Sequence, residues 1–278
     1  MIDTTYALAG RSISRLGYGA MRLCGQGVFG PPADESNALA VLRRAIELGV
    51  QFVDTSDAYG PEVSERQIAE ALAPYADDVV IATKGGLERP GPSRWTPNGA
   101  PANLRAACEG SLQRLGVEAI DLYQLHAVDE RVPLEESVGT LAALKTEGKI
   151  RHVGLSNVDA DELARARTIV EIASVQNRYN IGARDDDALI DLCAREGIAF
   201  LPYFPIEAGD LAKARGPLAN VARAHGATTA QIALAWLLHR APNVVPIPGT
   251  SSLAHLEENV AAREIELAPA ELRSLEAA

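Results

Sequence analysis

The hydrophobic positions along the chain repeat with two different periods. Segments in which apolar residues lie three or four positions apart, such as Leu39, Leu42 and Ile46, predict amphipathic helices. Short runs that are apolar at almost every position follow them, which is typical of strands covered on both faces. Gly49 and Gly148 stand at the junctions and suit the left-handed position that closes a helix. The chain is therefore predicted to alternate helix and strand.

Eight strands are predicted from this pattern: Leu16–Met21, Val50–Thr55, Val79–Lys84, Ile120–Leu125, His152–Ser156, Ala173–Arg178, Ala199–Phe204 and Val244–Pro248. Helices between consecutive strands imply right-handed βαβ units and a parallel sheet. Eight units in 278 residues favour a closed (β/α)8 TIM barrel over an open doubly wound sheet. Two short runs in Tyr6–Ser14 flank a Gly-Arg turn and predict a β-hairpin before the barrel. No shift in composition suggests a linker, so residues 1–278 are predicted to form one domain.

Charge and cysteine content restrict the partners. The formal net charge is −11, and a surface of that sign repels phosphate backbones and anionic lipid. Cys24, Cys108 and Cys193 are odd in number and far apart, which suggests neither a disulfide framework nor a thiolate metal site. No signal-like segment and no apolar run of membrane-spanning length is visible. We expect a cytoplasmic monomer or homo-oligomer without nucleic-acid or membrane partners.

Side chains that can hydrogen-bond follow the predicted strands at the end where barrel enzymes carry their chemistry. In strand order from the second to the seventh they are Asp54 with Tyr59, Lys84, His126, Ser156 with Asn157, Gln176, and Tyr203. Taken singly, each suits an ordinary structural role, such as an acid in a turn, a surface lysine or a buried core histidine. Their joint appearance on successive strand ends favours a site.

Four of these residues indicate a proton-donating site. A phenol is a poor acid near neutral pH, because its unperturbed pKa is about 10. An ammonium at Lys84 would lower the pKa of Tyr59, and a carboxylate at Asp54 would keep that ammonium charged and in place. His126 could hold a substrate carbonyl oxygen between itself and the phenol. General acid catalysis of this kind is worth roughly 10²- to 10⁴-fold, and only a hydride source is missing.

Nearly the whole chain resembles the aldo-keto reductase superfamily. The resemblance is carried by LGYGAM (16–21), DTSDAYG (54–60), Lys84 in VIATKGG, DLYQLH (121–126), GLSN (154–157), Gln176 in SVQNRYN, YFPI (203–206) and PIPGTSSLAHLEEN (246–259). The opening from residue 16 to residue 32 and the LEEN ending look like bacterial oxidoreductases of the superfamily that include pyridoxal-type reductases.

The resemblance implies a role for each matching residue. Tyr59 would donate the proton, Lys84 and Asp54 would tune it, and His126 would orient the substrate. Ser156, Asn157 and Gln176 would hold a nicotinamide carboxamide, with the ring stacked on Tyr203. Asp54 would also contact the cofactor, and the remaining implied cofactor contacts are Gly19, Ala20, Met21, Phe204, Pro205, Ile206, Pro248, Gly249, Thr250, Ser251, His255, Glu258 and Asn259.

Two departures from the family pattern affect the expected cofactor. Phe204 stands where many members have a serine after the stacking tyrosine, so a hydrogen bond to the pyrophosphate is lost there. The last motif also lacks the Lys or Arg that many members use for a 2′-phosphate, and offers hydroxyls, backbone N–H groups and His255 instead. NADP(H) is expected by resemblance, with NAD(H) as the rival.

Three further questions stay open at this level. Trp95 either walls the substrate pocket beside Tyr59 and His126 or is an ordinary loop aromatic. Segment 207–218 either covers the cofactor, with Lys213 or Arg215 near its phosphates, or is a solvated helix. The expected activity is reduction of a small aldehyde or ketone, pyridoxal-like or sugar-like, and the alternative is a cofactor-binding sensor with little turnover.

No metal is expected, because the histidines lack ligand spacing.

Overall fold

The computed structural model describes residues 4–207 and 215–277. The chain begins with β1 (Thr5–Leu8) and β2 (Arg11–Ser14), which pair antiparallel as the predicted hairpin. Its turn needs left-handed backbone, and Ala9 and Gly10 supply it with φ of 51° and 76°. Leu8 and Ile13 are buried against side chains inside the barrel, so the hairpin plugs one end of it.

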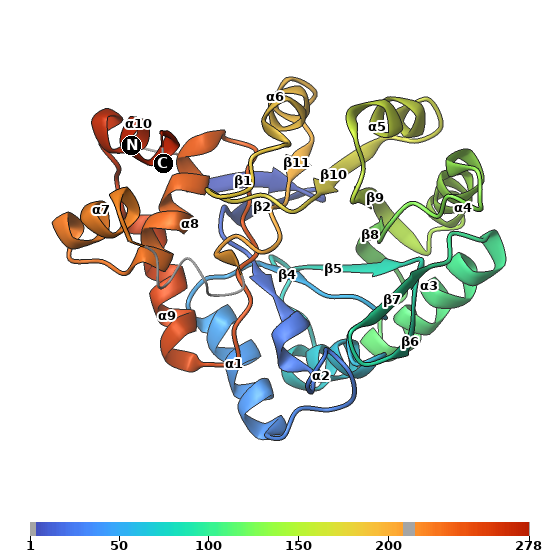
Figure 1. The fold of residues 1–278 in the computed structure, drawn as a ribbon. Coiled ribbons are helices and arrows are strands. Elements are labelled where there is room, and N and C mark those ends of the chain that lie inside the picture. Colours follow the sequence, from blue (N-terminus) through green and yellow to red (C-terminus); the bar gives the residue numbers. More distant parts are fainter. Residues whose placement is uncertain (1–3, 208–214, 278) are drawn as a thin grey trace.

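Seven parallel strands form the barrel wall (Figure 1). In spatial order they are β11 (Ala199–Phe200), β10 (Ile172–Gln176), β9 (Ile150–Ser156), β8 (Ile120–Leu125), β5 (Val80–Gly85), β4 (Phe52–Asp54) and β3 (Tyr18–Gly19). Their inward side chains, Phe52, Val80 and Leu122 among them, form an inner core, while the larger core lies between the strands and the helices.

The predicted last strand, Val244–Pro248, closes the barrel as an irregular segment. Its backbone bonds reach both neighbours: Val245 N to Phe200 O (2.9 Å) and Ile247 N to Pro202 O (3.4 Å) on one side, and Gly17 N to Pro246 O (2.9 Å) and Gly19 N to Pro248 O (3.2 Å) on the other. Pro246 and Pro248 have no N–H to return to β3. The ladder on that side is therefore half complete, which explains why no regular strand forms.

Helices cover the outside of the strands (Figure 1). They are α1 (Glu35–Glu47), α2 (Val63–Leu72), α3 (Pro101–Leu115), α4 (Leu134–Thr146), α5 (Ala160–Arg167), α6 (Asp187–Arg195), α7 (Pro217–His225), α8 (Thr229–Arg240), α9 (Leu253–Ala261) and α10 (Pro269–Glu276), with a 3-10 turn η3 (Ala262–Glu264) after α9. Gly49 and Gly148 have φ of 79° and 77°, as the helix-closing position requires. The (β/α)8 barrel and its hairpin are confirmed.

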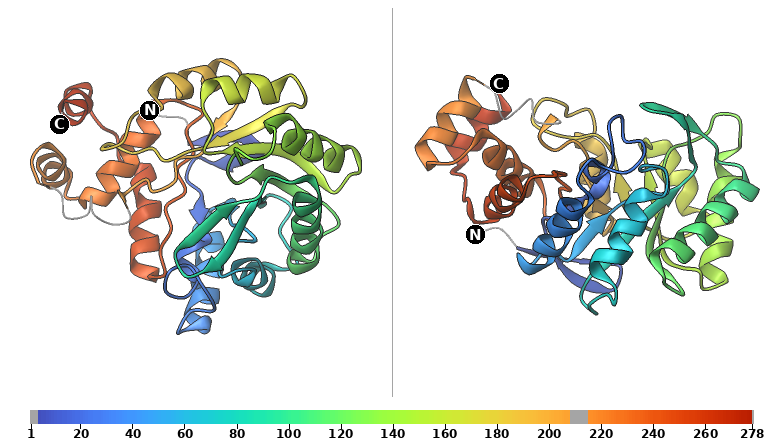
Figure 2. Two further views of the ribbon diagram at one scale, coloured as in Figure 1. Left: turned by 45° about the vertical axis from the view of Figure 1, so that its right-hand side comes forward. Right: turned by 90° about the horizontal axis from the view of Figure 1, so that it is seen from below.

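Several strands are shorter than predicted, each for a local reason. The first leaves the wall after Gly19 as a 3-10 turn, η1 (Ala20–Leu23). The seventh stops at Phe200, because Pro202 lacks an N–H and Phe204 takes a left-handed φ of 49°. A hairpin that was not predicted, β6 (Leu87–Gly91) and β7 (Arg94–Pro97), follows β5 and rises at the end opposite the first hairpin (Figure 2).

Candidate active site

The strand ends bring Asp54, Tyr59, Lys84 and His126 together. Lys84 leaves the end of β5 and places its Nζ 2.6 Å from Asp54 Oδ1, 2.7 Å from the Thr55 carbonyl oxygen and 3.3 Å from the Tyr59 hydroxyl. The Lys84 side chain is completely buried. Its three N–H donors are matched by these three acceptors among the described residues, so the ammonium is fixed directly behind the phenol.

Opposing influences set the pKa values of this cluster. Burial lowers the pKa of Lys84, but Asp54 and Tyr59 outweigh it, so the pKa lies above its ordinary value and the ammonium stays charged. Burial raises the pKa of Tyr59, and Lys84 lowers it by less. Lys84 thus acts on the phenol in the expected direction, whereas the expected net lowering is wrong for the protein without ligand.

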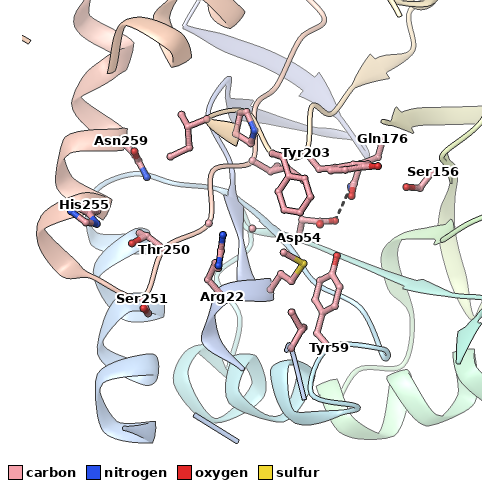
Figure 3. Close-up of a pocket in the computed structure, with 18 of the residues that line it drawn as sticks. Arg22, Asp54, Tyr59, Ser156, Gln176, Tyr203, Thr250, Ser251, His255 and Asn259 are labelled. Carbon is pink, nitrogen blue, oxygen red and sulfur yellow. Dashed lines mark hydrogen bonds between the residues drawn. The ribbon is translucent and has the colours of Figure 1, made fainter. Parts of the chain in front are cut away.

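Two amides hold the outer oxygen of Asp54. Gln176 Nε2 donates to Asp54 Oδ2 at 3.0 Å, as Figure 3 shows, and Gln124 Nε2 donates to the same oxygen at 3.3 Å. These glutamines come from β10 and β8. Both carboxylate oxygens of Asp54 are engaged, one by a cation and one by amides, so the side chain cannot turn away from Lys84.

His126 lies across from Tyr59, with ring centroids 5.8 Å apart at 82°. Its Nδ1 is 3.0 Å from Ser56 Oγ, which leaves Nε2 for a ligand in the cavity that the ring lines. Burial first, then the charges of Lys84 and Arg89, hold the pKa of His126 well below its ordinary value. The imidazole is therefore neutral near pH 7 and carries its proton on one nitrogen only.

The Asn157 side chain, which the resemblance assigns to the nicotinamide carboxamide, is already hydrogen-bonded within the protein. Asn157 has a left-handed φ of 57°, which asparagine tolerates better than most residues. Its Nδ2 donates to the His126 carbonyl oxygen (3.0 Å) and to Ser156 Oγ (3.1 Å), while its Oδ1 accepts from the Tyr203 hydroxyl (2.8 Å). Asn157 lines the cavity, but these bonds engage both its amide nitrogen and its amide oxygen, so it positions Ser156 and Tyr203.

A cavity of about 990 Å³ extends from Tyr59 to the start of α9 (Figure 3). Of the site residues expected from the sequence, it is lined by Gly19, Met21, Asp54, Tyr59, Trp95, His126, Ser156, Asn157, Gln176, Tyr203, Phe204, Pro205, Ile206, Gly249, Thr250, Ser251, His255, Glu258 and Asn259. Lys84 lies behind its wall, and Ala20 and Pro248 are not among the lining residues. A volume of this size suits a dinucleotide together with a small substrate.

Two glycines allow the floor of the cavity to form. A Cβ on Gly19 would lie 2.7 Å from the Ile247 carbonyl oxygen, and one on Gly249 would lie 2.5 Å from the Gly19 carbonyl oxygen. No side chain fits at either contact. The glycines of LGYGAM and PIPGTS are thus explained by the close approach of β3 to the closing segment, and they bring Thr250 to the cavity.

The far end of the cavity is a helix N-terminus. Ser252 caps α9, accepting from His255 N at 3.3 Å, and Thr250 Oγ1 accepts from Ser252 N at 3.0 Å. Backbone N–H groups and the positive end of the helix dipole favour an anion there. Arg22, which the sequence reasoning missed, also lines this end, and its Cγ lies 3.5 Å from where a Cβ on Gly249 would stand.

The near end has an aromatic wall. Trp95, on β7, lies 6.2 Å from both Tyr59 and His126 by ring centroids and is 38% exposed. Arg89 stacks on it, with Cζ 3.5 Å from the Trp95 ring centroid. The guanidinium also donates to the carbonyl oxygens of Gly27, Val28 and Ala58 at 2.8–2.9 Å. Arg89 therefore ties the β6–β7 hairpin to the loop before α1.

The remaining expectations concern segment 207–218, metal binding and membrane spans. Lys213 lies outside the described residues, and Arg215 is exposed and does not line the cavity. Within residues 4–207 and 215–277, no cluster of three or more His, Cys, Asp or Glu could hold a metal ion. Across the same ranges, every helix is too short or too polar to cross a bilayer.

Comparison with known proteins agrees with the fold. The family model for the aldo/keto reductase family matches residues 15–278. The chain is 46% identical over 282 residues to pyridoxine 4-dehydrogenase of Escherichia coli (strain K12), covering 99% of this chain and 98% of that protein. It is 47% identical over 255 residues to the uncharacterized oxidoreductase C215.11c of Schizosaccharomyces pombe, covering 92% and 83%.

A solved structure is similar along its whole length. The aldo/keto reductase of Klebsiella pneumoniae in complex with NADP and acetate superimposes with a TM-score of 0.84 at 28% identity, over 99% of this chain and 95% of that one. The chain therefore belongs to the aldo/keto reductase family. It is an oxidoreductase that depends on a nicotinamide cofactor.

Proposed function

We propose that the protein reduces a small aldehyde or ketone with NADP(H), and that Tyr59 gives its proton to the carbonyl oxygen. The observation that carries this proposal is the Lys84 ammonium 3.3 Å from the Tyr59 hydroxyl, with His126 across the same corner of the cavity. Tyr203, Ser156 and Gln176 would hold the nicotinamide, which would supply the hydride. When negative charge develops on the substrate oxygen, the phenol protonates it and Lys84 stabilises the phenolate left behind.

Ser156 and Gln176 have unused hydrogen-bonding positions that fit the nicotinamide carboxamide. A carboxamide offers one acceptor oxygen and two N–H donors. Ser156 Oγ accepts from Asn157 and keeps its hydroxyl proton for that oxygen, while Gln176 donates to Asp54 and keeps Oε1 for the N–H. The Tyr203 ring, fixed by its bond to Asn157, offers a face for stacking. This chain can therefore hold the ring in one orientation.

Arg22 supports NADP(H) over NAD(H). The sequence offers no Lys or Arg within PIPGTSS, but the fold places Arg22 beside Gly249, at the end where the α9 N-terminus favours an anion. Guanidinium groups bind phosphate strongly because they donate in a planar fork. Figure 3 shows Arg22, Thr250, Ser251 and His255 in this region of the cavity. We assign the 2′-phosphate to this group.

The aromatic wall supports a flat substrate. Tyr59, Trp95 and His126 meet edge to face, with interplanar angles of 63–87°. A planar aromatic aldehyde can lie on one of these rings while its carbonyl reaches the phenol. The similarity to pyridoxine 4-dehydrogenase of Escherichia coli points the same way. We therefore place pyridoxal-like aldehydes ahead of sugar-like carbonyls as substrates.

A cofactor-oxidation assay tests the activity. NADPH or NADH is mixed with the protein and a series of aldehydes that includes pyridoxal, benzaldehyde and a simple sugar aldehyde, and the loss of absorbance at 340 nm is followed. The proposal expects consumption of NADPH with pyridoxal and a higher kcat/KM for NADPH than for NADH. A protein that binds NADPH but consumes none with any carbonyl is the sensor, and a tenfold preference for NADH overturns the cofactor assignment.

A further inference from the structure

Ser56 connects the candidate orienting residue His126 to a second carboxyl group. Ser56 Oγ lies 3.0 Å from His126 Nδ1 and 3.0 Å from Asp57 Oδ1, and it accepts a third bond from Ala58 N at 3.0 Å. Ser56 is completely buried and Asp57 is half-buried. The roles described so far for Asp54, Tyr59, Lys84 and His126 use neither residue.

The number of hydrogen bonds that the Ser56 hydroxyl can donate and accept restricts how its partners are protonated. A hydroxyl has one donor hydrogen and two acceptor lone pairs. Ala58 N–H takes one lone pair, so one hydrogen and one lone pair remain for His126 Nδ1 and Asp57 Oδ1. If one of these two accepts from Ser56, the other must donate to it. The neutral imidazole and the carboxyl are therefore coupled through a single oxygen.

The two states of Asp57 lead to different tautomers of His126. An ionised carboxylate can only accept, so Ser56 donates to Asp57 and His126 must donate from Nδ1, which leaves Nε2 without hydrogen. A carboxyl protonated on Oδ1 donates to Ser56, and Ser56 then donates to His126 Nδ1. The ring hydrogen is then on Nε2, the nitrogen left to face a carbonyl oxygen. Only the second state makes His126 a donor to substrate.

The surroundings of Asp57 favour its neutral form. Burial first, and then the Glu65 carboxylate on α2, raise the pKa of Asp57 to about 7, against the lowering effects of the Ser56 hydroxyl, Arg114 on α3 and the Ala58 N–H. Tyr123 on β8 also senses the charge of Asp57. The charged groups that act on His126 are Lys84 and Arg89, and both oppose a second proton on the ring.

We propose that Asp57 and Ser56 are positioning residues that select the tautomer of His126: a neutral Asp57 carboxyl, acting through the Ser56 hydroxyl, places the imidazole hydrogen on Nε2. The role in catalysis rests on the proposed carbonyl reduction, whereas the tautomer itself is a property of the protein without substrate. The phenol of Tyr59 titrates far above this range because its pKa is raised. A change in activity near neutral pH is therefore assigned to Asp57.

Nitrogen NMR of the intact protein reads the tautomer directly. Long-range ¹H–¹⁵N spectra distinguish a protonated ring nitrogen from a bare one, and the His126 signals are assigned by their absence in a His126→Gln sample. We expect the hydrogen on Nε2 at about pH 5.5 and on Nδ1 at about pH 8.5, with a midpoint set by the carboxyl rather than by the ordinary histidine pKa. One tautomer that persists over this range, or a cationic ring at the acid end, would overturn the proposal.

Three substitutions test the path from Asp57 through Ser56 to His126, and a fourth is the control. Asp57→Asn removes the ionisation while its amide N–H can still donate to Ser56, so the hydrogen should stay on Nε2 at every pH. Ser56→Ala breaks the path, so the midpoint should disappear, and Ser56→Thr should restore it. Glu70→Gln, an exposed carboxylate on α2, is the matched control and should leave the titration unchanged. If the His126 tautomer still changes with pH in both Asp57→Asn and Ser56→Ala, the titrating group is not Asp57.

Kinetics separate this inference from the proposed function. The wild-type kcat/KM for carbonyl reduction should fall by about tenfold or more between the acid and alkaline ends, because losing one donor to a developing oxyanion costs up to roughly 10²- to 10³-fold. Asp57→Asn should remove most of that fall. Tautomer switching without any turnover would overturn the proposed reduction alone. Turnover with a pH profile that Asp57→Asn leaves intact would overturn the role of Asp57.

Discussion

The Lys84 ammonium and the Asp54 carboxylate form a buried ion pair, 2.6 Å apart, at the ends of neighbouring strands. A pair of this kind contributes less to stability than its distance suggests, because removing two charges from water costs nearly as much as their attraction gains. Its value here is positional. The carboxylate keeps the ammonium charged, and the ammonium lies against the phenol of Tyr59, which lines the cavity across from His126.

Removing the carboxylate should disable the site while leaving the barrel wall in place. In Asp54→Asn, Lys84 loses its counter-charge, and burial then lowers the pKa of the amine toward its neutral form. We expect kcat to fall by about 10²-fold or more, in line with losing electrostatic support for the phenolate, and the unfolding free energy to fall by about 3–5 kcal/mol. Steady-state kinetics and urea unfolding measure the two effects. An unchanged kcat would contradict this account of the ion pair.

Arg22 should discriminate between the two nicotinamide cofactors. Arg22→Ala removes the guanidinium beside Gly249, so the KM for NADPH should rise by about tenfold, as expected for one charged hydrogen-bond donor to phosphate. The KM for NADH, which has no 2′-phosphate, should change little. Arg66→Ala is the control, because Arg66 is exposed on α2 and does not line the cavity. An equal rise in KM for NADPH and NADH would contradict the assignment of Arg22 to the 2′-phosphate.

The stacked pair Arg89 and Trp95 should affect substrate binding more than the chemical step. Arg89→Lys keeps the charge but loses the planar face on the indole and the fork that reaches three carbonyl oxygens. We expect the KM for pyridoxal to rise by about 2- to 10-fold, the range of a cation–π contact, with a smaller change in kcat. Arg94→Lys, exposed on the same hairpin, is the control. A fall confined to kcat would place Arg89 in the chemistry instead.

Asp57 should make the fold less stable as pH rises. Its pKa is about 7 in the native state, against about 3.9 in an unfolded chain. The native state therefore binds the extra proton between these values, and the unfolding free energy contributed by this group falls as pH rises from about 4 to about 7. Asp57→Asn removes that loss, so its Tm advantage over wild type should be larger at pH 8 than at pH 5. Glu70→Gln should show no such change, and a constant difference for Asp57→Asn would contradict the raised pKa.

The four residues proposed for catalysis could be predicted because the barrel dictates where strand ends meet. Asp54 is the last residue of β4, Lys84 is the second-to-last residue of β5, and His126 directly follows β8. Tyr59 lies in the turn after β4. Once the alternation of helix and strand is recognised, the ends of consecutive parallel strands must lie on one rim. The side chains then need no further information to be neighbours. The net pKa of Tyr59 was not predictable, because it depends on how completely the ring is buried.

Arg22, Arg89 and Ser56 could not be placed in this way. Arg22 lies within the 3-10 turn that replaces the end of the first predicted strand. Arg89 lies on a hairpin with no clear strand pattern in RPGPSRW. Ser56 lies within DTSDAYG, but its proposed role depends on its contact with His126, which is 70 residues away in the sequence. Contacts made by loops depend on the path of the backbone, and hydrophobic periodicity does not describe that path.

The measurement that bears most directly on the central claim is the kcat of Tyr59→Phe for reduction of an aldehyde that the wild type accepts, taken together with the Kd for NADPH. The substitution removes one oxygen and keeps the ring against Trp95 and His126. We predict that kcat falls by about 10²- to 10⁴-fold while the Kd for NADPH changes less than about threefold. Turnover near the wild-type rate with the phenylalanine in place would contradict the claim that Tyr59 donates the proton.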